Sequence, residues 1–177
     1  MVFLFGFLYN KNMNYGRFYS FLYKRFHRYK HVVRLLNKIF TLLMYIVYPL
    51  LLMILWDNSF LWKAVLVPSV SFVIVTVIRS KINRLRPYEA WSIRPLIQKD
   101  TKGQSMPSRH VFSSVIISMT ILYLNKPLGI FFLIVSFLEA CIRVIAGLHY
   151  VSDVLVGYIL GILFGLIYFS WIEKVNS

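Results

Sequence analysis

The chain has 177 residues, of which 59% are hydrophobic and only 15% are charged. A soluble domain of this size is roughly half apolar and about one-quarter charged. The composition therefore excludes an ordinary soluble domain. Its long apolar runs predict an all-α, polytopic membrane helical bundle that forms one compact unit.

The positive charge is concentrated near the N-terminus. The formal net charge is +14, and residues 1–38 contain no Asp or Glu. Cations interleaved with aromatic residues also occur in nucleic-acid-binding proteins. Here they run directly into an apolar segment, so we expect contact with anionic lipid headgroups and no nucleic-acid partner. The single cysteine, Cys141, excludes an intrachain disulfide and is interpreted as a packing residue.

We predict a basic N-terminal segment at residues 1–38 and a membrane-embedded domain at residues 39–177. The apolar run 1–9 is too short to span a bilayer and has no basic region before it, unlike a cleaved signal peptide. In residues 17–37, apolar side chains and cations together favour an amphipathic helix lying in the membrane interface. An ordinary basic flank of the next segment explains this pattern equally well.

Five apolar segments are each predicted to be a spanning helix. They cover residues 39–56, 61–78, 110–124, 128–142 and 151–171. Residues 57–59 and 125–127 should form tight turns, and residues 79–109 a structured basic loop. An even number of crossings separates three polar clusters, at residues 79–87, 107–110 and 143–153, so all three should emerge on one membrane face. In the last span, glycines at 157, 161 and 165 would allow close helix packing.

Ionisable residues at membrane depth are rare and usually functional. In the first cluster, Arg79 and Arg86 offer planar guanidinium groups that suit phosphate oxygens. Lys81 and Arg84 are explained at least as well by the positive charge common in cytoplasmic loops.

The second cluster, Pro107-Ser108-Arg109-His110, is predicted to open a membrane helix. Ser108 can cap this helix, and its free backbone N–H groups would form an anion site. His110 stands beside that site and could protonate a leaving oxygen.

The third cluster contains Arg143, His149 and Asp153. If the chain is helical from Tyr150 onward, His149 and Asp153 lie one turn apart on one face. The carboxylate would then accept a hydrogen bond from one ring nitrogen and leave the other as a nucleophile or base. A purely structural His–Asp contact is the alternative. Glu139, one turn before Arg143, is expected to pair with that arginine.

These motifs, Arg79-x6-Arg86-Pro87, Pro107-Ser108-x-His110 and Arg143-x5-His149-x3-Asp153, resemble the three signature motifs of the type 2 phosphatidic acid phosphatase family. Its superfamily also includes the vanadium haloperoxidases. The resemblance covers residues 40–172. It implies an integral-membrane phosphatase for a lipid phosphate or diphosphate, of the phosphatidic acid, phosphatidylglycerophosphate or undecaprenyl diphosphate type. It implies no metal and no other cofactor.

By this resemblance, His149 would attack phosphorus and form a phosphohistidine, with Asp153 orienting the ring. His110 would protonate the leaving group and then activate water. The phosphoryl oxygens would be held by Arg79, Arg86, Ser108, Arg109 and Arg143. The chain departs from the family pattern in carrying Arg79 for the usual lysine, Arg109 for the usual glycine and Ile142 for a frequent serine.

Two alternatives remain open at this point. A non-catalytic protein could bind anions or lipids with the same pocket, whereas vanadate-dependent oxidation is disfavoured because the related oxidases are soluble. The basic N-terminus predicts a multi-pass cell-membrane protein with the site on the cytoplasmic side. If residues 17–37 cross the membrane, the site lies outside. The sequence does not define an oligomeric state.

Overall fold

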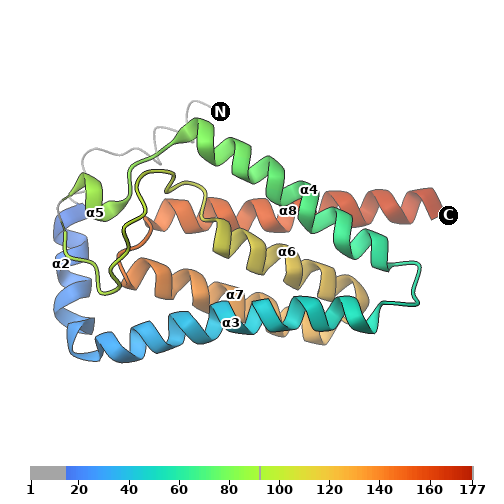
Figure 1. The fold of residues 1–177 in the computed structure, drawn as a ribbon, viewed down its shortest axis with the longest axis horizontal. Coiled ribbons are helices and arrows are strands. Elements are labelled where there is room, and N and C mark those ends of the chain that lie inside the picture. The colour runs from blue at the N-terminus through green and yellow to red at the C-terminus, as the bar shows by residue number, and fades with distance from the viewer. Residues whose placement is uncertain (1–14, 92, 177) are drawn as a thin grey trace.

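The computed structural model describes residues 15–91 and 93–176. Five long helices run side by side, and two short helices and a 3-10 turn lie at one end of them (Figure 1). The long helices are α3 (Lys30–Ile54), α4 (Leu61–Ile82), α6 (Arg109–Leu124), α7 (Lys126–Ile145) and α8 (Val151–Asn176). The short elements are α2 (Tyr15–Phe26), η1 (His27–Tyr29) and α5 (Pro87–Ala90). The apolar run 1–9 lies outside the described residues.

The helical architecture confirms the predicted all-α bundle. By length and composition, three helical stretches could cross a membrane: Tyr15–Ile54, Leu61–Ala90 and Lys126–Ile145. Two further apolar helices, Arg109–Leu124 and Val151–Ile167, are shorter. Large apolar side chains cover the outside of the bundle, among them Leu42, Val73, Phe131 and Leu163. Such an apolar exterior suits contact with lipid tails and not with water.

Most helix boundaries differ from the prediction by a few residues, and two of the differences concern the charged segments. Helix α3 begins at Lys30 and not at Ile39, and α4 continues to Ile82. Arg79 therefore lies in the last turn of α4, not in the loop as expected. The apolar sequence pattern ends at the first cation, but the backbone hydrogen bonds of the helix continue to Asn83. Asn83 adopts a left-handed conformation, with φ of 39°, and this conformation ends the helix.

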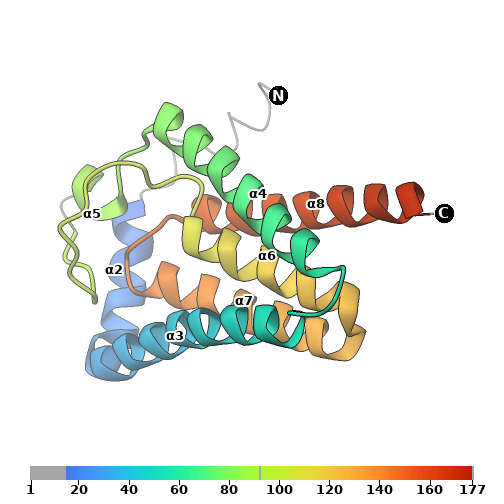
Figure 2. The same cartoon turned by 45° about the vertical axis from the view of Figure 1, so that its right-hand side comes forward.

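The N-terminal segment is divided between two helices. Helix α2 lies across the end of the bundle, η1 turns the chain, and residues 30–37 already belong to α3 (Figures 1 and 2). Tyr15 and Tyr19 are buried on one side of α2, whereas Lys24 and Arg25 are exposed. Helix α2 is therefore amphipathic, as predicted, but the amphipathic helix ends at Phe26. A separate role for residues 1–38 remains a prediction.

Helix α6 occupies the centre of the bundle and packs mainly against α7 and α8. Its side chains Val111, Phe112, Val115 and Ile116 are almost completely buried. A helix that is apolar on several faces is expected in such a central position. Its N-terminus, where Ser108 precedes the first turn, is thereby fixed between neighbouring helices.

The predicted glycine stripe on α8 is the surface that packs on α6. A Cβ atom at Gly157 would lie 2.8 Å from the Ser108 carbonyl oxygen. One at Gly161 would lie 2.7 Å from Cβ of Val115. These separations are shorter than normal carbon contacts, so only glycine permits the observed approach of the two helices.

Substituting Gly161 by valine should therefore separate α8 from α6. We expect a destabilisation of about 1 to 3 kcal/mol from overpacking, measured as a lower melting temperature of the detergent-solubilised protein, and reduced activity. The control is Ile159→Val on the exposed face of the same helix. Equal melting temperatures for the two variants would contradict the packing role of Gly161.

Candidate active site

The three polar clusters meet at one end of the bundle and are joined by hydrogen bonds. Arg79 of the first cluster donates from Nη1 to the carbonyl oxygen of Pro107 at 2.9 Å. The backbone N–H of Ser108 donates to the carbonyl oxygen of Asp153 at 3.0 Å. Segments far apart in the sequence therefore form a single site, as the count of crossings predicted.

His149 lies in the connection between α7 and α8 and is 2% exposed. Its Nδ1 lies 3.0 Å from the carbonyl oxygen of Ser105. Because a carbonyl only accepts hydrogen bonds, Nδ1 carries the proton in the neutral ring, and Nε2 retains its lone pair. Burial lowers the pKa of His149 to about 4, although Asp153 acts in the opposite direction. At neutral pH the imidazole is uncharged and can act as a nucleophile.

Asp153 contacts His149 less directly than the sequence predicted. Its Oδ2 lies 3.6 Å from Nδ1 of His149, beyond normal hydrogen-bond distance. Instead, Oδ2 accepts hydrogen bonds from the hydroxyl of Ser105 and from the backbone N–H of Tyr150. The ring is thus oriented mainly by Ser105, whose carbonyl holds Nδ1 and whose hydroxyl links to the carboxylate.

The sequence did not single out Ser105, and it did not predict a role for Arg84 either. Its Nη1 lies 2.8 Å from Oδ1 of Asp153 and 2.7 Å from Oγ of Ser152. Its guanidinium also lies over the ring of Tyr150, 4.0 Å from the centroid. A fully buried carboxylate such as Asp153 requires a cationic partner. This requirement is the signal in the sequence that could have distinguished Arg84 from the other cations of the loop.

Two buried polar groups of the site have no hydrogen-bond partner among residues 15–91 and 93–176: Nε of Arg79 and Oγ of Ser108. Ser108 is the N-cap residue of α6, but its hydroxyl does not bond to the helix backbone, contrary to expectation. Leaving a buried donor unpaired costs about 1 to 3 kcal/mol. Both groups are therefore available to a ligand with oxygen acceptors.

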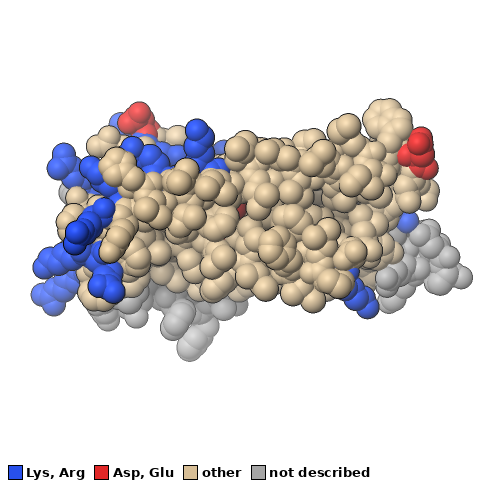
Figure 3. Space-filling view, turned by 90° about the horizontal axis from the view of Figure 1, so that it is seen from below, with Lys and Arg blue, Asp and Glu red and all other residues tan. Residues whose placement is uncertain are grey.

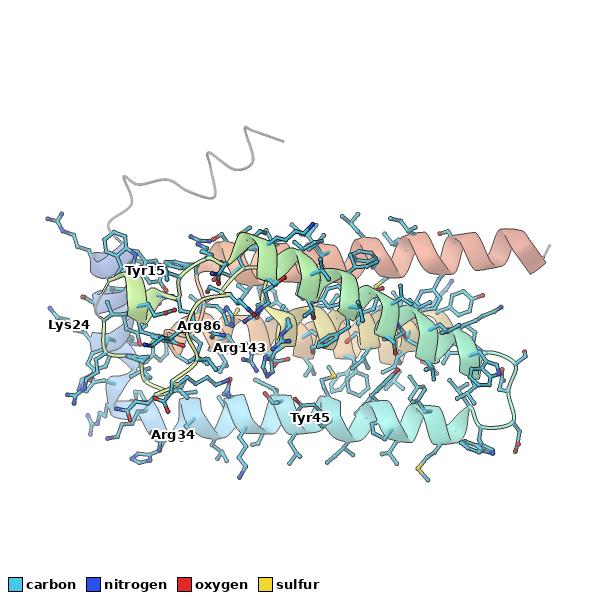
Figure 4. All side chains as sticks on the ribbon, turned by 45° about the horizontal axis from the view of Figure 1, so that its top comes forward. Tyr15, Lys24, Arg34, Tyr45, Arg86 and Arg143 are labelled. Atoms are coloured by element: carbon cyan, nitrogen blue, oxygen red, sulfur yellow. The ribbon has the colours of Figure 1, made fainter. Side chains whose placement is uncertain are left out.

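Arg86 and Arg143 add two buried guanidinium groups, which lie close together near the site end of the bundle (Figure 4). Nε of Arg86 donates to the carbonyl oxygen of Gly103 at 3.1 Å. Arg143 forms the predicted ion pair with Glu139, also at 3.1 Å. Lys99, which the sequence did not single out, is partly exposed, but partial desolvation and these arginines lower the pKa of its ammonium group. The site is strongly electropositive.

His110 and Arg109 lie at the edge of a cavity of about 580 Å³ between α3, α4 and α6. His110 is within electrostatic range of Arg143, Lys99 and His149. The remaining cavity wall is mostly apolar and includes Met44, Tyr48, Pro68, Phe72, Ile116 and Ile117. The cavity thus has Arg109 and His110 of the site in its wall and is otherwise a largely apolar space inside the bundle.

Comparison with known proteins agrees with this geometry. Residues 60–177 match the model of the PAP2 superfamily, and the chain belongs to that family. Undecaprenyl-diphosphatase BcrC from Bacillus subtilis (strain 168) is 27% identical over 164 residues, covering 88% of this chain and 84% of the relative. Family membership and the apolar helices place the chain in a family of membrane phosphatases.

Several solved structures share the fold, among them two crystal structures. The crystal structure of Aquifex aeolicus LpxE has a TM-score of 0.64 and 23% identity, over 79% of this chain and 93% of that one. The crystal structure of the first transmembrane PAP2 type phosphatidylglycerolphosphate phosphatase from Bacillus subtilis has a TM-score of 0.57 and 22% identity. The match covers 89% of this chain and 94% of that one. At these identities, the likeness concerns the fold alone.

The buried His149 should make stability depend on pH. Its folded pKa of about 4 lies below the value of about 6.5 for an exposed imidazole. The unfolded chain therefore binds more protons between these values, and stability falls as the pH is lowered through this window. In melting curves between pH 7 and pH 4, His149→Gln should show a smaller loss than the parent. The control is His31→Gln, at an exposed histidine. If His149→Gln lost as much stability between pH 7 and pH 4 as the parent, the pH dependence could not be assigned to His149.

Removing Arg84 should leave the carboxylate of Asp153 without its ion pair. We expect Arg84→Met to lower stability by about 1 to 3 kcal/mol, as for other unpaired buried polar groups, and to reduce turnover. The matched control is Lys81→Met, which removes an exposed cation near the same helix end. Melting and activity would be measured side by side. Identical behaviour of the two variants would show that Arg84 is only a surface charge.

Proposed function

We propose that this protein is an integral-membrane phosphatase that hydrolyses a lipid phosphate or diphosphate through a phosphohistidine at His149, without a metal ion. One observation carries the proposal. A buried, neutral imidazole with a free Nε2 lies in the same site as two unpaired buried donors, Nε of Arg79 and Oγ of Ser108. This combination suits nucleophilic attack on a bound phosphoryl group.

In the first step, Nε2 of His149 attacks phosphorus, and the bond from phosphorus to the leaving oxygen breaks. His110 gives a proton to that oxygen. In the second step, water attacks phosphorus, the bond from phosphorus to Nε2 of His149 breaks, His110 accepts a proton from the water, and inorganic phosphate leaves. The imidazole of His149 stays oriented in both steps, because its Nδ1 remains hydrogen-bonded to the carbonyl oxygen of Ser105 and Asp153 lies beside the ring.

The charge of the transferred group is neutralised by Arg79, Arg86 and Arg143. Fixed cations aimed at the equatorial oxygens are the main requirement for catalysis of phosphoryl transfer. Ser108 and the first backbone N–H groups of α6 donate further hydrogen bonds, since a helix N-terminus favours anions. Arginines thus supply the positive charge that metal ions provide in other phosphatases, and the proposed reaction is metal-independent.

The substrate is a lipid because Arg109 and His110 also line a largely apolar cavity, within a bundle whose exterior is apolar too. The phosphate can reach the arginines while the tail remains among apolar side chains. The relative in Bacillus subtilis is named an undecaprenyl diphosphatase, and we propose a substrate of that class. Phosphatidic acid and phosphatidylglycerophosphate are the other members of a substrate panel.

We further propose a multi-pass protein of the cell membrane with five crossings. Lys and Arg side chains gather at the end that carries the site, leaving a middle band of other residues (Figure 3). Lys24 and Arg34 lie at the outer edge of this end (Figure 4), where they can bind anionic headgroups. By the positive-inside rule, this end faces the cytoplasm.

The purified protein should release phosphate from at least one lipid of the panel in the presence of EDTA, and vanadate should inhibit it. His149→Ala should lose activity by about 1,000-fold or more, as expected when a nucleophile is removed. The exposed His31→Ala is the control. Phosphate release that His149→Ala retains would refute the phosphohistidine. A folded parent protein that binds these lipids without turnover would instead establish a non-catalytic lipid-binding protein.

A further inference from the structure

Arg109 stands apart from the other cations of the site. It occupies the first turn of α6 and is half-buried. Its guanidinium lies over the ring of Phe72 in α4, 5.7 Å from the centroid. Among the described residues it forms no ion pair. A cation held on an aromatic face keeps its hydrogen-bond donors available to a ligand.

The cavity explains what Arg109 could bind. Arg109, His110 and Ser113 form part of the polar end of the cavity, where Glu139 also contributes. The carboxylate of Glu139 is already engaged by Arg143 at 3.1 Å. The charge of Arg109 is therefore not compensated by an acidic group of the cavity, and an anion on this side of His110 would be stabilised.

Resting on the proposed function, we propose that Arg109 binds the phosphate group next to the lipid tail of a diphosphate substrate. The terminal phosphate then occupies the pocket of Arg79, Arg86 and Arg143. The tail lies along the apolar part of the cavity, which includes Met44, Tyr48 and Ile117. Arg109 thereby makes the enzyme selective for lipid diphosphates over lipid monophosphates.

The chemistry of the leaving group supports this division of roles. When Nε2 of His149 attacks the terminal phosphorus, the bond to the bridging oxygen breaks, and a lipid monophosphate leaves. His110 protonates that bridging oxygen, so the remaining phosphate lies on the side of His110 and of its neighbour Arg109. A lipid monophosphate instead loses a neutral alcohol, which carries no charge for Arg109 to stabilise.

The test compares two substrates with the same tail, farnesyl diphosphate and farnesyl monophosphate, in detergent. Arg109→Met keeps an unbranched apolar stem beside Phe72 but removes the charged guanidinium group. We expect kcat/KM for the diphosphate to fall by about tenfold or more, the scale of a lost charge-assisted hydrogen bond. For the monophosphate, kcat/KM should change by less than about threefold. Arg109→Lys should restore part of the difference.

Lys102→Ala is the matched control, because it removes one exposed cation from the loop near the site. It should affect both substrates equally and weakly. If Arg109→Met does not fold, Phe72→Leu replaces it: loss of the aromatic face should raise KM for the diphosphate alone. Three results would overturn the proposal: Arg109→Met loses kcat/KM equally on both substrates, it loses none on either, or the parent enzyme prefers the monophosphate. A parent that hydrolyses neither substrate nor the lipid panel would refute the proposed function itself.

Discussion

Buried positive charge is the constraint on which this structure depends. Arg79, Arg86 and Arg143 are each at least 93% buried, since 4%, 7% and 1% of their surfaces are exposed. Taking a guanidinium out of water is costly unless it is paired and hydrogen-bonded. Among the described side chains, two carboxylates are buried, and they compensate these charges only in part, because Glu139 pairs with Arg143 and Asp153 pairs with Arg84. Arg79 and Arg86 keep carbonyl contacts but have no carboxylate within ion-pair distance among the residues that the structure describes.

The helices and the loop hold these charges in place despite their mutual repulsion. Close packing of α8 on α6 at Gly157 and Gly161 fixes the position of Ser108 against Asp153. On the other side, Leu96 is buried against the chain near Ala146, and its N–H donates to that residue's carbonyl oxygen at 3.1 Å. The loop between α5 and α6 is thus attached next to His149. Part of the packing energy of the bundle offsets the cost of assembling an electropositive pocket.

Some of this arrangement could be predicted from the sequence, because motif spacing and an even number of crossings are properties of the chain itself. They placed His110, Arg143 and His149 at one end of the bundle. Hydrophobic patterning could not show that α4 continues past Arg79, since the helix is ended by the left-handed Asn83 and not by loss of apolar character. The role of Ser105 could not be predicted either. Its contacts with His149 and Asp153 depend on how a loop folds over a distant helix end, and a lone serine carries no pattern.

The balance of charge also explains why the pocket fits a multiply charged phosphoryl group better than a neutral ligand. Before a ligand binds, Nε of Arg79 and Oγ of Ser108 are buried without partners among the described residues, and the repulsion among the arginines is relieved only in part. A phosphate supplies several acceptor oxygens and negative charge at once, so it removes both costs. Charge that accumulates on the oxygens during transfer is stabilised further by the same fixed groups. The buried cations that are costly to the free protein therefore favour binding of the phosphoryl group and, to a greater degree, its transition state.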